Sequence, residues 1–391
     1  MKRIYMDNAA TTRVTEPVLE AMMPYLTDVY GNPSSIHGFG REARRALDDA
    51  RARVARAINA QPSEIYFTSC GSEADNWAVR GTACALRDRG RHIITSAIEH
   101  HAVLHTCQQL EKEGFRVTYV PVDGAGVVRL DALEAAITPE TTLISVMAAN
   151  NEIGTLQPVA AIGEIARAHG IRFHTDAVQA IGAIPIDVQA LGVDMLSMSG
   201  HKFHAPKGVG ALYVRSGTRL QRLIEGGTQE RAQRGGTENL ASIVGMGRAI
   251  ELATANIAEK AEKLTAMRDR LMNGVIEAIP ESRVNGHPTQ RLPGNCNVSI
   301  RYIEGESLLL SLDLKGIAAS SGSACTSGSL DPSHVLLAIG LPHEIAHGSL
   351  RFSLSEENTM EDVEFVLESL TEIVQRLRNM SPLTPDELKT V

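Results

Sequence analysis

The regular alternation of strand-like and helix-like segments between residues 60 and 214 limits most strongly how this chain can fold. Short apolar runs suited to buried strands alternate there with stretches of helical length. Neighbouring parallel strands need a crossover connection, which is usually a helix. The pattern therefore predicts an α/β fold, with a mostly parallel sheet and helices on both of its faces.

The chain has 391 residues, more than one hydrophobic core usually serves. A long helix is expected at Ile257–Ala278, and shorter strands and helices alternate again after it. We therefore expect two domains, with the boundary near the start of this helix.

Composition narrows the possible partners. Apolar residues make up 43% of the chain and charged residues 21%, as in a soluble globular protein. The net charge of −8 argues against nucleic acid or an anionic membrane as a partner, and no apolar run reaches the length of a membrane span. Five scattered cysteines without a CxxC pair, and an N-terminus without an apolar signal core, favour a cytoplasmic protein with reduced thiols.

Two strand-like runs, Phe173–Asp176 and Met195–Met198, have ionisable residues at or just beyond their ends. Asp176 closes the first run, and Lys202 follows the second. In an open α/β sheet such ends line the ligand crevice. A lysine that forms a Schiff base and an aspartate that holds a pyridinium nitrogen are what pyridoxal phosphate (PLP) requires.

The alternative is that Asp176 only caps a strand and that Lys202 is a solvated surface charge. The same turn also contains Ser199, His201 and His204. A solvated loop does not need these residues, so the turn favours the cofactor site.

The segment Ser69–Asn76 follows a strand expected at Glu64–Thr68 and opens a helix. The free backbone N–H groups of a helix N-terminus bind anions readily. Ser72, followed by acidic residues, would also serve as a plain N-cap. The segment is therefore a candidate seat for the phosphate of PLP.

Polar residues follow two further strands. His100 and His101 could bind a metal ion, but no thiol or carboxylate at suitable spacing completes a set, and no metal is expected. A histidine there can instead stack on a cofactor ring and transfer protons. Asn150 and Asn151 suit recognition of a carboxylate or phenolate oxygen, although asparagine also favours turns.

The segment 320–330 is rich in serine and glycine and contains Cys325. No apolar residue anchors it, so we expect a mobile loop. An exposed free cysteine is a liability unless its reactivity is used. Cys325 is therefore a candidate nucleophile that travels to its substrate.

Two metal patterns remain as remote alternatives. His343 and His347 match the HExxH pattern of zinc hydrolases, but the stretch lies between Pro342 and Gly348, directly before a strand, so the required long helix is missing. His174, Asp176 and His201 could imitate a non-haem iron triad.

Longer motifs show a resemblance over nearly the whole chain. The chain resembles the cysteine desulfurases of the class-V PLP enzymes, and within them the NifS-like branch. The motifs are DNAATT, YGNPSSIHGFG, TSCGSEADN, IEHHAVL, NNEIGTLQP, FHTDAVQA, SGHKFHAPKGVGALYVR, RGGTEN, ASSGSACTSGSLDPSHV and AHGSLRFSLS.

The resemblance implies the fold of the aspartate aminotransferase-like PLP enzymes, fold type I. Residues 16–256 would form the large PLP-binding domain. Residues 1–15 and 257–391 would form the small domain, which carries the catalytic-cysteine loop 320–330.

The resemblance also implies a role for each matching residue. Lys202 would form the Schiff base, Asp176 would pair with the pyridine nitrogen, Gln179 would approach the ring hydroxyl, and His100 would stack on the ring and handle protons. The remaining implied contacts are Gly71, Ser72, Ser199, Gly200 and His201 to the phosphate, Thr237 to the phosphate of a second subunit, and Asn151 and Arg351 to the substrate carboxylate.

The implied reaction removes sulfur from L-cysteine and gives L-alanine and a persulfide on Cys325. An iron–sulfur scaffold protein would accept the sulfur, in a NifS-like setting for nitrogenase maturation, and the enzyme would be a homodimer. A selenocysteine lyase or an aminotransferase of the same fold is the nearer alternative. Ser72 stands where the family usually has Thr, and it keeps the hydroxyl. His101 stands where Pro or Lys is commoner, for which we have no physical account.

Overall fold

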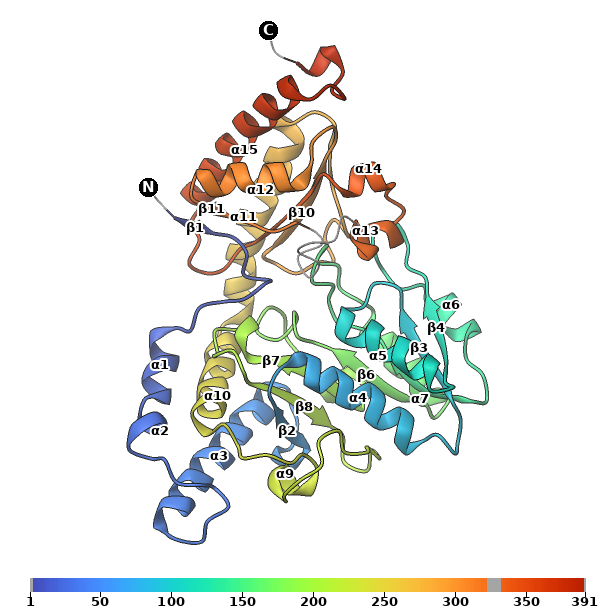
Figure 1. Ribbon diagram of the computed structural model, residues 1–391, viewed down its shortest axis with the longest axis vertical. Helices are drawn as coiled ribbons and strands as arrows, with labels where there is room; N and C mark the ends of the chain where they lie inside the picture. The colour runs from blue at the N-terminus through green and yellow to red at the C-terminus, as the bar shows by residue number, and fades with distance from the viewer. Residues whose placement is uncertain (1–2, 322–331, 390–391) are drawn as a thin grey trace.

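The computed structural model describes residues 3–321 and 332–389. Figure 1 shows a large lower body built around one sheet, and a smaller upper body that contains the C-terminal helices. The chain starts in the upper body, builds the lower body, and returns to the upper body through the long helix α11 (Ile257–Ala278).

The central sheet has seven strands in the order β2-β8-β7-β6-β5-β3-β4. All neighbours in the run from β7 to β4 are parallel, and β8 alone runs antiparallel to both of its neighbours. The mostly parallel sheet predicted from the sequence is thereby confirmed. The strands are β2 (Ile65–Thr68), β3 (His92–Ser96), β4 (Arg116–Val120), β5 (Thr141–Ser145), β6 (Arg172–Asp176), β7 (Met195–Ser199) and β8 (Gly210–Val214).

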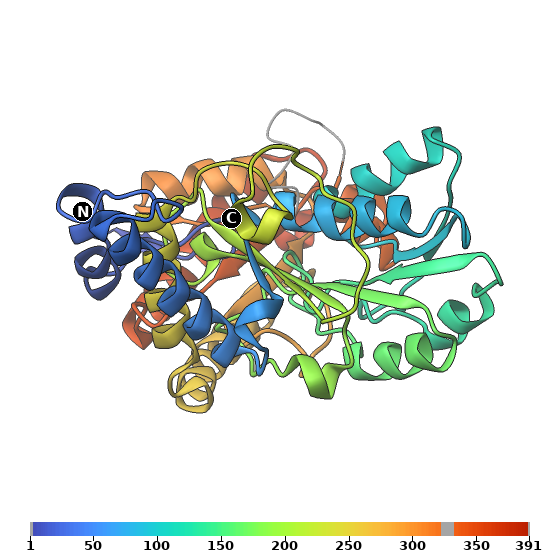
Figure 2. The ribbon, with the colours of Figure 1, turned by 90° about the horizontal axis from the view of Figure 1, so that it is seen from below.

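Helices cover both faces of this sheet, as Figure 2 shows. Successive residues of a strand point to opposite faces, so a strand buried on both sides serves two cores. Leu143 packs with helices α4 (Gly71–Ala85) and α5 (His101–Lys112), and Ile144 packs in the core on the other face. That second core is covered by α3 (Gly38–Ala57), α7 (Val159–Ala168) and α10 (Leu240–Thr254).

Shorter elements complete the large body. They are α1 (Glu16–Met22), α2 (Pro24–Thr27), α6 (Leu130–Ala135), α8 (Val188–Leu191), α9 (Gln229–Ala232) and the 3-10 turns η1 (Pro62–Glu64) and η2 (Gly200–Lys202).

The smaller body has its own hydrophobic core, which includes Ile4 and Met6 from the N-terminal segment. An antiparallel sheet of order β12-β10-β9 lies beside a parallel pair of β1 and β11. Its separate core supports the predicted domain division at 15/16 and 256/257, which stays a prediction. Its elements are β1 (Ile4–Tyr5), β9 (Ser282–Val284), β10 (Asn295–Ile300), α12 (Gly305–Leu314), β11 (Ile317–Ala318), β12 (Ser349–Ser353), α15 (Met360–Met380) and η3 (Asp386–Leu388). Two short helices of the same part of the chain, α13 (His334–Ala338) and α14 (His343–Ala346), instead bury their apolar residues in a core of the large body.

The described residues contain neither a metal-binding cluster nor a membrane-spanning helix. Over residues 3–321 and 332–389, no three histidine, cysteine or acidic residues are grouped so that they could hold a metal ion. In the same part of the chain, no helix is both long enough and apolar enough to cross a membrane.

A buried ion pair ties α3 to the loop that precedes α10. Both terminal nitrogens of Arg51 donate to Glu230, each at 2.7 Å, and both side chains are buried. The backbone N–H of Phe67 on β2 also donates to Glu230, at 2.9 Å. Loss of one partner would leave a buried charge uncompensated, which is far more costly than loss of an exposed pair.

We expect Arg51→Met to lower the free energy of unfolding by about 3–5 kcal/mol, because it strands the Glu230 carboxylate in the interior. Urea denaturation followed by circular dichroism measures the change. Arg44→Met is the matched control, because it removes an exposed pair with Asp48 on the same helix, and it should cost about 0.5 kcal/mol or less. Equal losses in the two variants would contradict the prediction.

Candidate active site

Strands β6 and β7 bring Asp176 and Lys202 to one edge of the sheet. The strands are parallel neighbours, and Asp176 pairs in register with Ser197. Lys202 follows in η2, one turn beyond the end of β7. Its amine donates to the backbone oxygens of Ala9 at 2.5 Å and Ala10 at 2.8 Å. The N-terminal segment therefore lies across the strand ends at this point.

A cavity of about 360 Å³ reaches Lys202 from the junction of the two bodies. Gln179 lines it from the large body, and its side-chain nitrogen donates to Ala9 O at 3.0 Å. Leu264 and Ser353 line it from the small body. Both bodies therefore form walls around the lysine.

Asp176 is a buried carboxylate at the end of β6. Its Oδ1 atom accepts the backbone N–H of Val178 at 2.8 Å. Burial raises the pKa of Asp176 to about 6, although the Val178 hydrogen bond and the charge of Lys202 act in the opposite direction. Such a carboxylate stabilises a protonated nitrogen placed against it, because the pairing offsets the cost of burying its charge.

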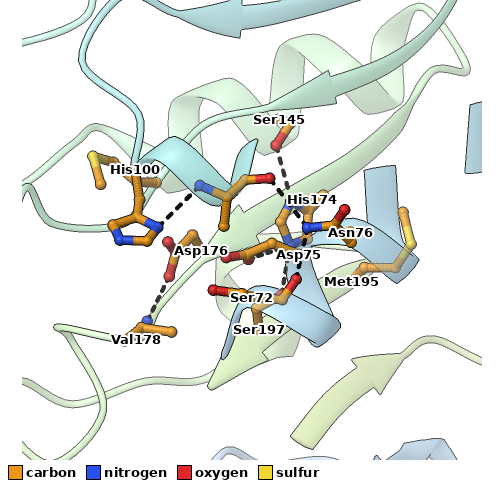
Figure 3. Close-up of polar contacts among 12 residues, drawn as sticks. Ser72, Asp75, Asn76, His100, Ser145, His174, Asp176, Val178, Met195 and Ser197 are labelled. Atoms are coloured by element: carbon orange, nitrogen blue, oxygen red, sulfur yellow. Dashed lines mark hydrogen bonds and ion pairs between the residues drawn. The ribbon is translucent and has the colours of Figure 1, made fainter. Parts of the chain in front are cut away.

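A buried polar cluster lies behind Asp176, on strands β5, β6 and β7 and helix α4 (Figure 3). The ring nitrogens of His174 are hydrogen-bonded to the hydroxyls of Ser145 and Ser197, both at 2.9 Å. Asp75 Oδ1 lies 3.7 Å from His174 Nε2. Burial lowers the pKa of His174 to about 3 and raises the pKa of Asp75 well above its usual range. His174 is thus a neutral core residue rather than a ligand in the iron triad considered from the sequence.

The start of α4 packs tightly against the end of β7. A Cβ atom on Gly71 would lie 2.8 Å from Val178 Cγ2 and 3.2 Å from Ser199 Cβ, so only glycine fits there without displacing a neighbour. The N-cap residue Cys70 provides no side-chain hydrogen bond to the first turn. The helix therefore presents its amide groups close to the turn after β7, which is the geometry of an anion site.

The residues predicted to hold a phosphate come from these two places. Gly71 and Ser72 open α4, Ser199 ends β7, and Gly200 and His201 form the turn before Lys202. Burial lowers the pKa of His201 to about 4, with the charges of Lys202 and Lys207 acting in the same direction. Their roles as phosphate contacts stay a prediction.

His100 is the N-cap of α5. Its Nδ1 atom accepts the backbone N–H of Ala102 at 3.1 Å, which fixes the orientation of the ring (Figure 3). Burial and then the charge of Lys202 lower the pKa of His100 to about 4. The imidazole is therefore neutral near pH 7 and able to stack on an aromatic ring or accept a proton.

Glu99 is a buried acid that the sequence analysis missed. Ser96 Oγ donates to it at 2.5 Å, and the backbone N–H of Met147 donates to both of its oxygens, at 3.0 and 3.1 Å. Burial raises the pKa of Glu99 to about 8, and the nearby Asp176 charge contributes to the rise. It joins the ends of β3 and β5, and an acid directly before His100 was the only signal for it in the sequence.

Arg351 lies on β12 and reaches from the small body to the large one. Its guanidinium donates to Asn151 O and to Asp7 Oδ1, both at 3.0 Å, and the side chain is buried. Its Nε–H has no hydrogen-bond partner among the described residues. An arginine that lies between the two bodies and has an unused N–H donor can bind a carboxylate bidentately.

Cys325 lies outside the described residues. Ser320, shortly before it in the chain, forms a two-way backbone bridge with Arg351, at 3.1 and 2.6 Å. Thr237 is exposed in the loop between α9 and α10. Its predicted contact to a second subunit stays a prediction.

The chain is similar in sequence to proteins of known family over almost its whole length. The family model of the class-V aminotransferases matches residues 4–366. A protein of Methanosarcina thermophila named cysteine desulfurase IscS is 60% identical over 390 residues, which is 100% of this chain and 96% of that relative. A protein of the same name from Clostridium botulinum strain Hall is 56% identical, over 99% of this chain and 98% of the relative.

The fold is also similar to that of solved structures. A structure named NifS-like protein has a TM-score of 0.90 and 42% identity, over 95% of this chain and 99% of that chain. The structure of SspA in complex with cysteine has a TM-score of 0.81 and 38% identity, over 92% of this chain and 100% of that chain.

The raised pKa of Glu99 predicts a pH dependence of stability. Between about pH 4.3 and 8 the folded chain holds a proton on Glu99 that the unfolded chain has released, so this carboxyl makes stability fall as the pH rises. Glu99→Gln replaces this carboxyl with an amide that does not titrate. Its stability relative to wild type should rise with pH across this window, by up to about 1.4 kcal/mol per pH unit.

Urea denaturation of the cofactor-depleted protein at several pH values measures this trend. Glu164→Gln, an exposed carboxylate on α7, is the matched control. If the free energy of unfolding of Glu99→Gln ran parallel to that of wild type from pH 5 to pH 8, Glu99 would be ionised throughout this range, and the prediction would be wrong.

Proposed function

This chain belongs to the class-V aminotransferase family and, within it, to the cysteine desulfurases, and from this premise we propose how its residues use PLP and L-cysteine. The observation that carries the proposal is the position of Lys202 and buried Asp176 at the same ends of two neighbouring parallel strands, in a chain 60% identical to a named cysteine desulfurase. We infer that the enzyme takes sulfur from L-cysteine for iron–sulfur cluster assembly.

The residues present fit PLP. The close packing at Gly71 leaves backbone amides for a phosphate group, and Asp176 is a buried carboxylate in need of a cationic partner. When bound, PLP supplies an electron-accepting ring that weakens bonds at the α-carbon of an amino acid. Lys202 would carry the cofactor as a Schiff base, Asp176 would keep the ring nitrogen protonated, and Gln179 would approach the ring hydroxyl.

Proton transfer is assigned to two residues. Once a substrate amine has displaced it, the Nζ atom of Lys202 would accept the α-proton of the substrate. His100, neutral because burial and the charge of Lys202 lower its pKa, would stack on the ring and exchange protons through its imidazole.

The substrate carboxylate would bind Arg351, with Asn151 beside it. In the structure Arg351 donates to Asp7, and an incoming carboxylate would replace this partner with one of the same charge. L-Cysteine bound in this way has its sulfur free for attack.

Cys325 is proposed as the sulfur acceptor. Its thiolate would attack the substrate sulfur, a new S–S bond would form, and the Cβ–S bond would break with its electron pair left on the carbon fragment. Protonation of that fragment gives L-alanine, and the sulfur stays on Cys325 as a persulfide.

Delivery of the sulfur needs a partner. We propose an iron–sulfur scaffold protein in the cytoplasm as the acceptor. A homodimer, with Thr237 completing the phosphate site of the other subunit, is part of the proposal. The nitrogenase setting stays a prediction, because the cited relatives carry the IscS name.

Cys325→Ala tests the division of roles. Production of sulfide and alanine from L-cysteine should fall by about two orders of magnitude or more, while the visible absorbance of bound PLP is kept, because the thiol does not hold the cofactor. Cys84→Ala is the control. Unchanged formation of sulfide and alanine in the Cys325 variant would contradict the role of this thiol as sulfur acceptor, and loss of both signals would contradict the division of roles.

Arg351→Lys tests the carboxylate site. A lysine keeps the charge but loses the planar fork, so KM for L-cysteine should rise by about tenfold or more, with a smaller change in kcat. Steady-state alanine formation measures both constants. Arg301→Lys alters an exposed pair with Glu281 and should leave KM unchanged. A fall in kcat at constant KM would place Arg351 outside the substrate site.

A further inference from the structure

An ion pair connects the start of α4 to the loop between α9 and α10. Arg234 binds Glu73 through two nitrogens, with Nε to Oε1 at 2.8 Å and Nη2 to Oε2 at 3.1 Å. The side chains are only 19% and 9% exposed. A two-pronged contact of this kind fixes the relative position of the two segments.

Glu73 also closes the turn before α4. Its Oε2 atom accepts both the backbone N–H of Ser69, at 2.8 Å, and the Ser69 hydroxyl, at 2.5 Å. Burial acts to raise the pKa of Glu73, but the hydrogen bonds from Arg234 and Ser69 outweigh it and lower the pKa below its usual value. Glu73 is therefore an anion in the first turn of the helix.

Helix α9, which leads directly into the loop that carries Arg234, has a strained backbone. Glu230, Arg231 and Ala232 all have left-handed backbones, with φ of 45°, 56° and 62°. Non-glycine residues keep such a conformation only where their surroundings enforce it. An uninterrupted run of three marks a segment whose shape is set by its contacts.

Two residues of α9 attach this part of the chain to β2. Glu230 accepts the N–H of Phe67, and Arg231 donates to Ile65 O at 2.7 Å while lying 4.1 Å above the ring of Tyr66. Figures 1 and 2 accordingly place α9 beside β2 and α4. Because β2 runs directly into the turn before Gly71, the loop and the start of α4 form one connected unit.

The ionised Glu73 creates an electrostatic problem for the proposed phosphate site. A phosphate bound at Gly71 and Ser72 would carry close to two negative charges, next to a carboxylate in the same helical turn. Arg234 is the cation that compensates this carboxylate. The helix N-terminus can then favour the phosphate without repulsion from its own third residue.

We propose that Arg234 is a positioning residue for the cofactor phosphate, because it offsets the charge of Glu73 in the first turn of α4. This inference rests on the proposed function, because it assumes that PLP places its phosphate at the start of α4. Arg234 does not itself touch the phosphate. It acts through Glu73.

Binding of PLP to the full chain after cofactor removal tests the proposal, with the visible absorbance of the Lys202 adduct as the readout. Arg234→Met should raise the Kd for PLP by about tenfold, because it leaves the Glu73 charge uncompensated. Adding Glu73→Gln to that variant should bring the Kd back to within about threefold of wild type. A purely structural role predicts the opposite, since the double variant would lose still more contacts.

Pyridoxal, which lacks the phosphate, separates the phosphate site from the ring site. Its affinity should be the same in wild type and Arg234→Met. Arg80→Met is the matched control, because it removes an ion pair in which one nitrogen of Arg80 donates to both oxygens of Glu113. This pair lies on the same helix but away from the first turn, and its loss should leave PLP binding unchanged. Should Arg234→Met fail to fold, Arg234→Lys and Arg234→Gln replace it, and the charged variant should bind PLP more tightly than the neutral one.

Three results would overturn the inference while the proposed function stands: wild-type affinity for PLP in Arg234→Met, no recovery on adding Glu73→Gln, or an equal loss of pyridoxal affinity. A wild-type chain that takes up no PLP would overturn the proposed function and this inference with it.

Discussion

The parallel pairing of β6 with β7 is the constraint on which the candidate site depends. Parallel neighbours end at the same edge of a sheet, so the carboxylate that closes β6 and the amine that follows β7 meet there. Both strands are buried on both faces, which fixes their register. A slip of one residue would turn Asp176 toward the opposite face of the sheet.

Burial, rather than direct contact, sets the charge state of most groups around this edge. His100, His174 and His201 are kept neutral by desolvation, and Glu99 and Asp75 are pushed toward their protonated forms. Few other charges then compete with Lys202 and Arg351 for an incoming ligand. A site of this kind favours a ligand that brings a cationic ring nitrogen for Asp176 and a carboxylate for Arg351.

Local pattern was sufficient to predict the elements and the strand-end residues. The sequence pattern located the helix Ile257–Ala278 at its observed bounds, and it located the strand-like runs Phe173–Asp176 and Met195–Met198 within one residue of the bounds of β6 and β7. The buried acids Glu99 and Asp75 were not predicted as site neighbours, because their surroundings come from strands distant in the chain. Arg351 entered only through the family resemblance, since its contact with Asp7 joins residues 344 positions apart.

Ion pairs between segments far apart in the chain hold the two bodies and the strained segment together around the candidate site. Arg351 links β12 to the N-terminal segment that lies over Lys202, and Arg234 links the Thr237 loop to the start of α4. Each of these charged side chains would cost free energy in its half-buried or buried position without the opposite charge beside it. Each segment is therefore stable in place only when its partner segment is also in place. The geometry around the lysine thus depends on segments from three parts of the chain. This mutual dependence explains why the strained backbone at Glu230 is maintained: without the contacts to β2 and α4, the loop would relax and the compensation of Glu73 would be lost.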